Sequence, residues 1–181
     1  IARGVFAHSD NSASVAYSDG SGRLCLENLS AAGDSRSKNC MVDYSYPPIT
    51  LQQAADGDIY IGQGSPRAIR KVSPLGVVRW VRISPDPNSY SNQPLSGVDS
   101  AGNYFEVGGN TLLRWSAADG TLLNKVAVGN ATQSYAAVLA RANQQLVIGS
   151  TTSTQSGVTV QLSRMQPDGL VLWSTPASFS A

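Results

Sequence analysis

The chain has 181 residues, enough for one domain with a sizeable core, and only 14% of them are charged. The formal net charge is +1, from 13 Lys and Arg against 12 Asp and Glu, and these residues form no basic cluster, which argues against a nucleic-acid partner. No apolar run approaches the ~20 residues that cross a bilayer, so we expect no membrane span. The first residue is Ile1 rather than Met, and we expect a processed or excised part of a longer precursor.

Four segments of the chain repeat one pattern. They span 4–45, 49–84, 93–129 and 135–176, and we expect them to form a single domain over 1–181. A late turn glycine recurs in each segment, at Gly33, Gly76, Gly120 and Gly169, with spacings of 43, 44 and 49 residues. A repeat of this length with several short strands in each unit is typical of the blades of a β-propeller.

Each segment divides into four short strands separated by turns. In the third segment we expect strands at 95–98, 104–107, 111–115 and 121–128, with turn signals at Ala101-Gly102 and Asp119-Gly120 between them. No window shows a sustained helical period with helix caps. We therefore predict an all-β fold: a β-propeller of four four-stranded antiparallel blades. A β-sandwich explains the short strands equally well, but it does not explain four equivalent segments.

The arrangement of the blades around an axis stays open at this point. Both end segments contain four predicted strands, so no exchange of a strand between the termini is evident. Three interpretations remain: a closed four-bladed ring, half of a larger ring, or a part of a larger propeller whose other blades lie in a missing part of the chain.

The second segment carries a recognisable repeat motif. It reads Gly57-Asp58-Ile59-Tyr60-Ile61-Gly62 and continues through Arg70-Lys71-Val72 and Gly76 to Trp80, and Trp173 follows Gly169 at the same distance. This pattern resembles the quinoprotein-like (PQQ-like) propeller repeat family over most of 49–176. The first and third segments carry Ser37 and Asn124 at the tryptophan position. The resemblance implies a propeller of bacterial type and raises the alternative of a fragment of a quinoprotein-like dehydrogenase, whose cofactor pocket needs blades beyond these four.

The chain holds two cysteines. Cys25 falls in the predicted third strand of the first segment and Cys40 in its fourth strand, and their midpoint lies in the turn between these strands. They should face each other across the hairpin, so we predict a disulfide, with two buried free thiols as the alternative. A disulfide indicates an oxidising compartment, either the periplasm or the outside of the cell.

A search for catalytic chemistry finds little. His8 is the single histidine, no G-x-S-x-G elbow is present, and most carboxylates fall in turns, where they support the backbone. Glu106 lies within a strand, and we expect a bulge there and a side chain that points to solvent. The acidic turns lack the ligand spacing of a calcium loop. We therefore expect no enzyme, no cofactor and no metal.

The distribution of tyrosine suggests a binding face. In a propeller, the connections between blades share one face with the loops between second and third strands, and tyrosine, asparagine and arginine there are typical of an adaptable contact surface. The predicted binding residues are Tyr44, Tyr46, Arg67, Asn88, Tyr90, Asn92 and Tyr135. We thus expect a non-catalytic extracytoplasmic module that binds a protein, peptide or glycan partner. The alternatives are tyrosines that pack as lids over blade edges, and a purely structural spacer.

Overall fold

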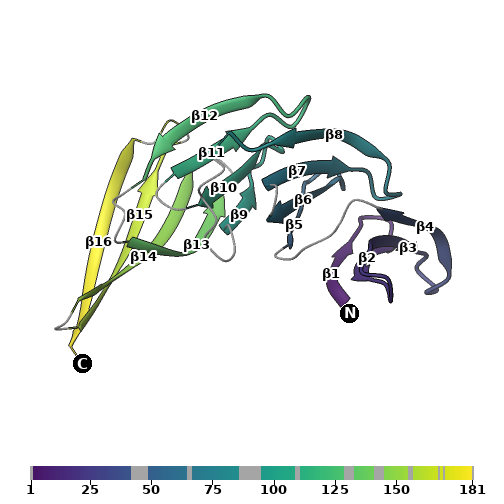
Figure 1. The fold of residues 1–181 in the computed structure, drawn as a ribbon, viewed down its shortest axis with the longest axis horizontal. Coiled ribbons are helices and arrows are strands. Elements are labelled where there is room, and N and C mark those ends of the chain that lie inside the picture. Colours follow the sequence, from purple (N-terminus) through teal and green to yellow (C-terminus); the bar gives the residue numbers. More distant parts are fainter. Residues whose placement is uncertain are drawn as a thin grey trace. The chain divides into compact units, whose positions relative to one another are not determined.

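The structure is a computed structural model that describes residues 2–41, 49–64, 67–85, 95–108, 111–128, 133–140, 145–154, 157–166, 168 and 170–180. These residues form sixteen strands in four four-stranded antiparallel sheets, and each sheet is built from four strands that are consecutive in the sequence (Figure 1). The predicted architecture of four antiparallel four-stranded units is confirmed. Among these residues, none belongs to a helix long and apolar enough to cross a membrane.

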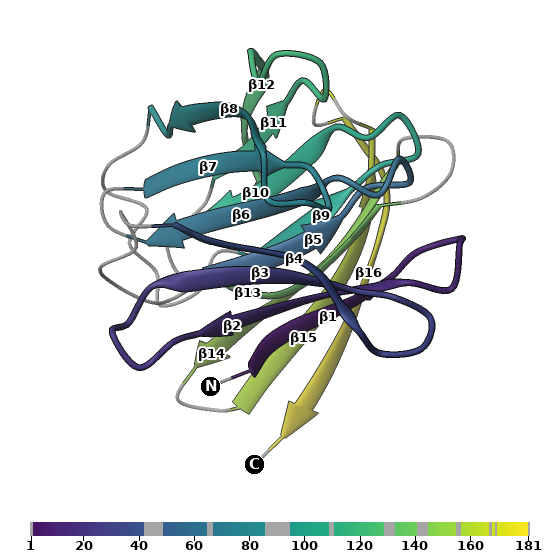
Figure 2. The ribbon, with the colours of Figure 1, turned by 90° about the vertical axis from the view of Figure 1, so that its right-hand side faces the viewer.

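The chain divides into two compact units, 1–84 and 85–181, and each contains two sheets. The first sheet of the first unit consists of β1 (Ala2–Ala7), β2 (Ala13–Ser18), β3 (Leu24–Leu29) and β4 (Ser35–Met41). The second consists of β5 (Ile49–Gln53), β6 (Ile59–Gly64), β7 (Arg67–Val72) and β8 (Val78–Ile83). Figure 2 shows the first sheet of this unit below the second, and β1 contacts β5.

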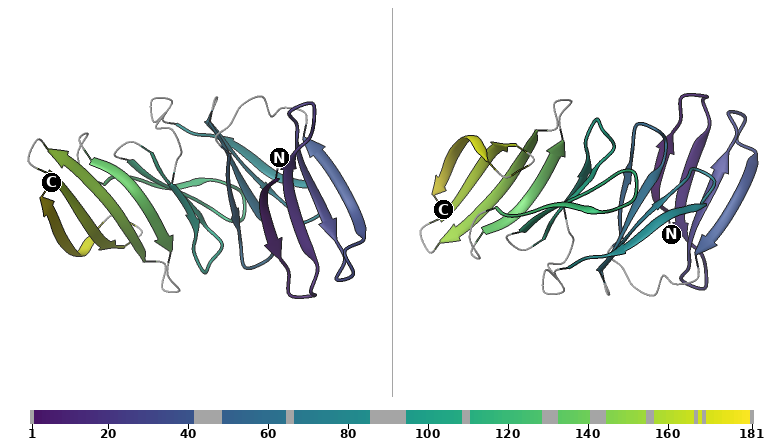
Figure 3. Two further views of the ribbon diagram at one scale, coloured as in Figure 1. Left: turned by 90° about the horizontal axis from the view of Figure 1, so that it is seen from below. Right: turned by 90° about the horizontal axis from the view of Figure 1, so that it is seen from above.

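The second unit repeats this plan. Its first sheet consists of β9 (Leu95–Val98), β10 (Tyr104–Gly108), β11 (Thr111–Trp115) and β12 (Leu122–Ala127), close to the strands predicted for this segment. Its second sheet consists of β13 (Gln133–Ala140), β14 (Leu146–Thr154), β15 (Gly157–Met165) and β16 (Val171–Ser180). Here β9 contacts β13, so the first strands lie together in both units, as blades around an axis require (Figure 3).

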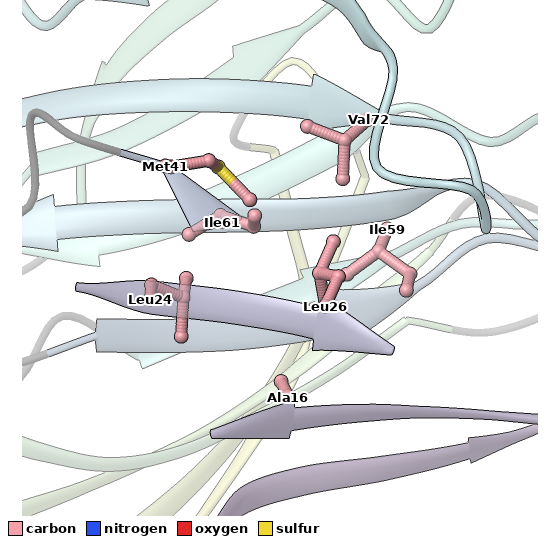
Figure 4. Packing of buried hydrophobic residues seen from close by; sticks show 7 residues of the cluster. All are labelled: Ala16, Leu24, Leu26, Met41, Ile59, Ile61 and Val72. Carbon is pink, nitrogen blue, oxygen red and sulfur yellow. The ribbon is translucent and has the colours of Figure 1, made fainter. Parts of the chain in front are cut away.

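The core of the first unit lies between its two sheets. Side chains alternate between the two faces of each sheet. We call the face that points toward the following sheet in the sequence the forward face. The opposite face, which points toward the preceding sheet in the sequence, is the rear face. The forward face of the first sheet supplies Ala16, Leu24, Leu26 and Met41, and the rear face of the second supplies Ile59, Ile61 and Val72 (Figure 4). All seven side chains are buried, so each sheet covers apolar surface that the other cannot cover alone.

The core of the second unit uses the same register positions. The forward face of its first sheet supplies Phe105, Val107 and Leu112, and the rear face of its second sheet supplies Leu146, Ile148 and Met165. Ile59, which pairs with Val72, corresponds to Leu146, which pairs with Met165. The two units therefore stack their sheets by one rule, although they share few identical side chains.

The predicted disulfide is present. Cys25 on β3 lies opposite Cys40 on β4, and their sulfur atoms are bonded at 2.05 Å. The bridge lies on the rear face of the first sheet, where Tyr17 pairs with Cys25 in register. The Tyr17 hydroxyl donates to Glu27 Oε2 at 3.0 Å, and the Lys38 ammonium lies 5.3 Å from the centre of the Tyr17 ring. This rear face is thus bridged and charged.

The expectation for Glu106 is wrong on both counts. β10 pairs with β9 and with β11 without a register shift, so there is no bulge, and Glu106 is 1% exposed. The error came from taking Gly62 as the end of a strand. β6 passes through Gly62 and ends at Gly64, so the interval from Gly57 to Gly62 does not measure the length of that strand and gives no reason to expect a bulge in β10.

Candidate functional site

Three turns between first and second strands share one backbone design. They span 8–12, 54–58 and 99–103, and in each the first amide donates to the fifth carbonyl at 2.9–3.0 Å. The fourth residue has a positive φ in every case, which is 61° for Asn11, 84° for Gly57 and 80° for Gly102. Asn and Gly tolerate this left-handed backbone, which explains the turn signals in the sequence.

A carboxylate closes each of these turns from within. Asp10 Oδ1 accepts from the amide of Ser12 at 3.0 Å, and Asp56 Oδ1 accepts from the amide of Asp58 at 3.0 Å. Asp99 accepts from the amide of Asn103 at 2.7 Å. The interpretation of these aspartates as turn formers is therefore correct for their Oδ1 atoms, and their second oxygens remain for other partners.

The third strand carries a cation to the turn in three of the four sheets. Each cation occupies the same register position on its third strand. It pairs with the second-strand residue that lies two places after the end of the turn: Lys71 with Tyr60, Arg114 with Phe105 and Arg164 with Val147. Lys71 Nζ lies 3.1 Å from Asp56 Oδ2 and 3.3 Å from Asp58 Oδ2. Arg114 lies 3.1 Å from Asp99 Oδ2, and Arg164 donates to Gln145 Oε1 through Nε at 2.6 Å.

The first sheet is the exception. Its third strand carries Asn28 at this position, paired with Ser14. The amide of Asn28 donates to Ser14 Oγ at 3.5 Å, whereas a lysine or arginine there has the length to reach the turn. Asp10 Oδ2 instead lies 3.4 Å from Arg36 on β4, in an exposed pair. The short asparagine thus leaves space beneath the first turn.

A cavity of about 590 Å³ opens at this place, within the first unit and between its two sheets. The first sheet lines it with His8, Asp10, Asn28 and Arg36, among others, and the second sheet with residues of its first turn and of the turn before β8. Polar groups that both donate and accept hydrogen bonds converge here, next to the apolar Pro74 and Leu75. A cavity of this size falls within the range of small-ligand sites.

A hydrogen-bond network fixes His8 at the cavity wall. Gln53 Nε2 lies 3.1 Å from His8 Nδ1, and because an amide nitrogen only donates, Nδ1 accepts and the ring proton lies on Nε2. Nε2 then donates to Ser14 Oγ at 2.8 Å, and the Ser14 hydroxyl donates to the carbonyl of Pro74 at 3.3 Å. Ser14 is fully buried, so this Ser–His pair presents no nucleophile to the cavity.

The two carboxylates of the cavity stay ionised in neutral solution. Hydrogen bonds from the Ser12 hydroxyl and amide, together with Arg36, lower the pKa of Asp10. Partial burial raises the pKa of Asp56, but the Asp58 amide and the Lys71 ammonium outweigh it and leave that pKa below its usual value. Asp10 and Asp56 are therefore acceptors with solvent-exposed oxygens, and Arg36 and Lys71 balance their charge.

The structure does not test the binding residues predicted from the sequence, and none of them is among the described residues that line the cavity. Tyr44, Tyr46, Asn88, Tyr90 and Asn92 fall outside the described residues. Arg67 begins β7 and Tyr135 lies in β13. The sequence reasoning missed the cavity because it treated His8 as isolated. The signal for the cavity lies in an alignment of the four segments. At the third-strand position, the first segment has Asn28, whereas the others have Lys71, Arg114 and Arg164.

No family model and no curated protein matches this chain. Solved structures do match. A catalytically inactive virginiamycin B lyase from Staphylococcus aureus with quinupristin aligns at 10% identity with a TM-score of 0.64, over 99% of this chain and 70% of the lyase. The putative TolB from Agrobacterium tumefaciens aligns at 11% identity with a TM-score of 0.58, over 99% of this chain and 68% of that protein. A gluconolactonase from Xanthomonas campestris aligns at 15% identity with a TM-score of 0.53, over 81% of this chain and 53% of its own length.

These comparisons support the propeller fold, because the lyase and the TolB protein are β-propellers. They also correct the prediction that this chain is not an enzyme. Two of the matching structures are enzymes, a lyase and a gluconolactonase, so the lack of a catalytic motif in a sequence of this fold does not exclude catalysis, and that prediction is wrong. The chain has the sheet architecture of a β-propeller.

Proposed function

We propose that this chain is a propeller module that binds a glycan in the cavity beneath its first turn. The observation that carries the proposal is the replacement of the third-strand cation by Asn28, which leaves a polar cavity where the second and third sheets place an ion pair. The cavity offers carboxylate acceptors, a guanidinium donor, amides and an imidazole beside apolar carbons. Sugar hydroxyls both donate and accept, and sugar rings expose C–H faces, so this mixture suits a neutral saccharide.

Charge narrows the ligand class. Asp10 pairs with Arg36 on the cavity wall, and Asp56 pairs with Lys71, which is buried and does not line the cavity. Both wall carboxylates therefore already have a cationic partner. A strongly anionic ligand would meet both carboxylates, and a strongly cationic ligand would meet Arg36, the one Lys or Arg among the described residues that line the cavity. A neutral saccharide meets neither penalty, and its hydroxyls have two carboxylate acceptors and one guanidinium donor within the cavity.

The test is a binding screen followed by one blocking substitution. Ligand-observed NMR with a panel of neutral mono- and disaccharides identifies the best ligand for the wild-type chain. Asn28→Lys places a lysine at the position that Lys71 occupies in the second sheet, so the fold should persist. The lysine side chain should fill the cavity and pair with Asp10. Binding should weaken at least tenfold, which corresponds to about 1.4 kcal/mol.

Ala32→Lys is the matched control, because it adds the same charge to an exposed turn of the same sheet, outside the cavity. It should leave the affinity unchanged. A saccharide that binds wild-type and Asn28→Lys equally well would contradict the assignment of the site. A panel in which no saccharide binds would contradict the ligand class.

We also propose that the module works outside the cytoplasm, in the periplasm or the extracellular space. The support is the Cys25–Cys40 bridge, since stable disulfides form in oxidising compartments. The tyrosine-rich face remains a separate prediction: Tyr46→Ala and Tyr90→Ala should weaken capture of a protein or peptide partner and leave saccharide binding unchanged.

Finally, we propose that the four sheets belong to a ring of more than four blades rather than to a closed four-bladed ring. The support is the length of the matching propellers. Almost the whole of this chain, 99%, aligns with 70% of the lyase and with 68% of the TolB protein.

A further inference from the structure

The forward face of the fourth sheet carries the positions that pack sheets together in both units. In the second unit, Leu112 pairs with Val107 on the forward face of the third sheet, and both are buried against the fourth sheet. The equivalent pair in the fourth sheet is Leu162 with Gly149, because Arg164 and Arg114 occupy the same register position two residues later. Within each unit, the forward face of the first sheet packs against the rear face of the second sheet. By the same pattern, the forward face of the fourth sheet should pack against the rear face of another sheet.

This forward face carries exposed apolar side chains next to Arg164 and Thr175, which the same register places on it. Val158, Val160, Leu162 and Trp173 share it by register. Leu162 is 47% exposed and Trp173 is 39% exposed, whereas the equivalent Leu112 is 1% exposed. The opposite face of the same sheet is buried through Leu146, Ile148 and Met165. A contiguous apolar surface of this kind marks an interaction site.

The rear face of the first sheet does not suit it. In that sheet Val15 occupies the position of Ile61, and its register neighbours are Val5, which is exposed, and the charged pair Glu27 and Lys38. Closing the ring within one chain, or joining two chains head to tail, would place Leu162 and Trp173 on this charged cluster. Burying Glu27 and Lys38 beneath Leu162 and Trp173 would remove their hydration, which is costly.

We propose that the forward face of the fourth sheet packs against the rear face of a further four-stranded blade of this repeat. That blade carries aliphatic residues at the positions of Ile59, Ile61 and Val72. The rear face of the second sheet has these residues, and the rear face of the fourth sheet has Leu146, Ile148 and Met165 at the same positions. The inference rests on the proposed ring of more than four blades, and it is independent of the glycan site.

The experiment uses a single reactive thiol. Because Cys25 and Cys40 are bonded to each other, Leu162→Cys introduces the one free cysteine of the chain. A second copy of residues 42–84 is appended after Ala181, so that the chain's own second blade, with its preceding connection, serves as the partner. Thiol labelling by a maleimide should be fast in the 181-residue chain and at least about tenfold slower in the extended chain, because a covered thiol reacts only when the sheets open.

Two controls isolate the contact. Leu123→Cys, at a leucine that is 49% exposed in β12, should label at the same rate in both chains. Changing Ile61 to Asp in the appended copy alone should restore fast labelling of Cys at position 162. Amide exchange of the appended segment reports whether that segment has folded.

Each other outcome overturns the inference in a distinguishable way. Slow labelling in the dilute monomeric 181-residue chain would mean that the chain covers its own face, which refutes the larger ring as well. Slow labelling that depends on concentration would make a second copy the occupant. An appended blade that folds without slowing the labelling, or that stays unfolded beside the exposed face, would refute the inference and leave the glycan site untouched.

Discussion

Removing the disulfide should destabilise the first unit by a calculable amount. The double substitution Cys25→Ala, Cys40→Ala opens a bridge between residues separated by 15 positions. A cross-link that closes a loop of this length restricts the unfolded chain by about 3 kcal/mol. Cys25 is also fully buried, and the loss of its sulfur contacts adds somewhat less than about 1 kcal/mol. We therefore expect the free energy of unfolding to fall by about 3–4 kcal/mol.

The assay is equilibrium urea unfolding, with amide exchange used to assign the loss to one unit. In thermal unfolding, a unit of 84 residues should lose about 12–32 °C of melting temperature for this change. Val5→Ala, on an exposed position of the same sheet, serves as the control and should change stability by less than about 0.5 kcal/mol. A loss below about 1 kcal/mol, or one confined to residues 85–181, would refute the reasoning.

Two further predictions concern turns. Hydrogen bonds from the Thr121 hydroxyl and amide lower the pKa of Asp119 to about 2, so its stabilising contribution is complete above the usual pKa near 4 and is lost as the pH falls through about 2. Asp119→Asn should therefore lower the melting temperature at pH 7, and the difference from wild type should shrink between pH 4 and pH 2; a difference independent of pH would contradict this. Gly33→Ala and Gly76→Ala both place a side chain at a positive φ, of 88° and 76°, which costs about 1 kcal/mol. Gly76→Ala should cost more in urea unfolding, because its Cβ would lie 2.6 Å from Asn39 Cβ while that of Gly33 meets open space, and equal costs would argue against this contact.

The strands and the disulfide could be predicted from the sequence because their signals are local. In the third segment, apolar runs bounded by Gly102 and Gly120 place the strands within one or two residues of their observed ends. The spacing of Cys25 and Cys40 around a turn fixes their register. Glu106 shows the limit of this reasoning, because a glycine such as Gly62 can lie inside a strand and does not always mark its end.

The cavity could not be predicted in the same way, because it depends on contacts between distant residues. His8 meets Gln53, 45 residues away, and Ser14 meets Pro74, 60 residues away, only after two sheets stack. One local signal existed nevertheless. Asn28 stands where the other three sheets carry a cation, and a residue that breaks an internal repeat is a candidate for function.

The most direct test of the glycan site observes the imidazole of His8, the single histidine of the chain, by long-range proton–nitrogen NMR. We expect the ring resonances to shift progressively as the best saccharide of the panel is added to wild type but not when it is added to Asn28→Lys. A saccharide that binds the wild-type chain while the His8 resonances stay unchanged would contradict it.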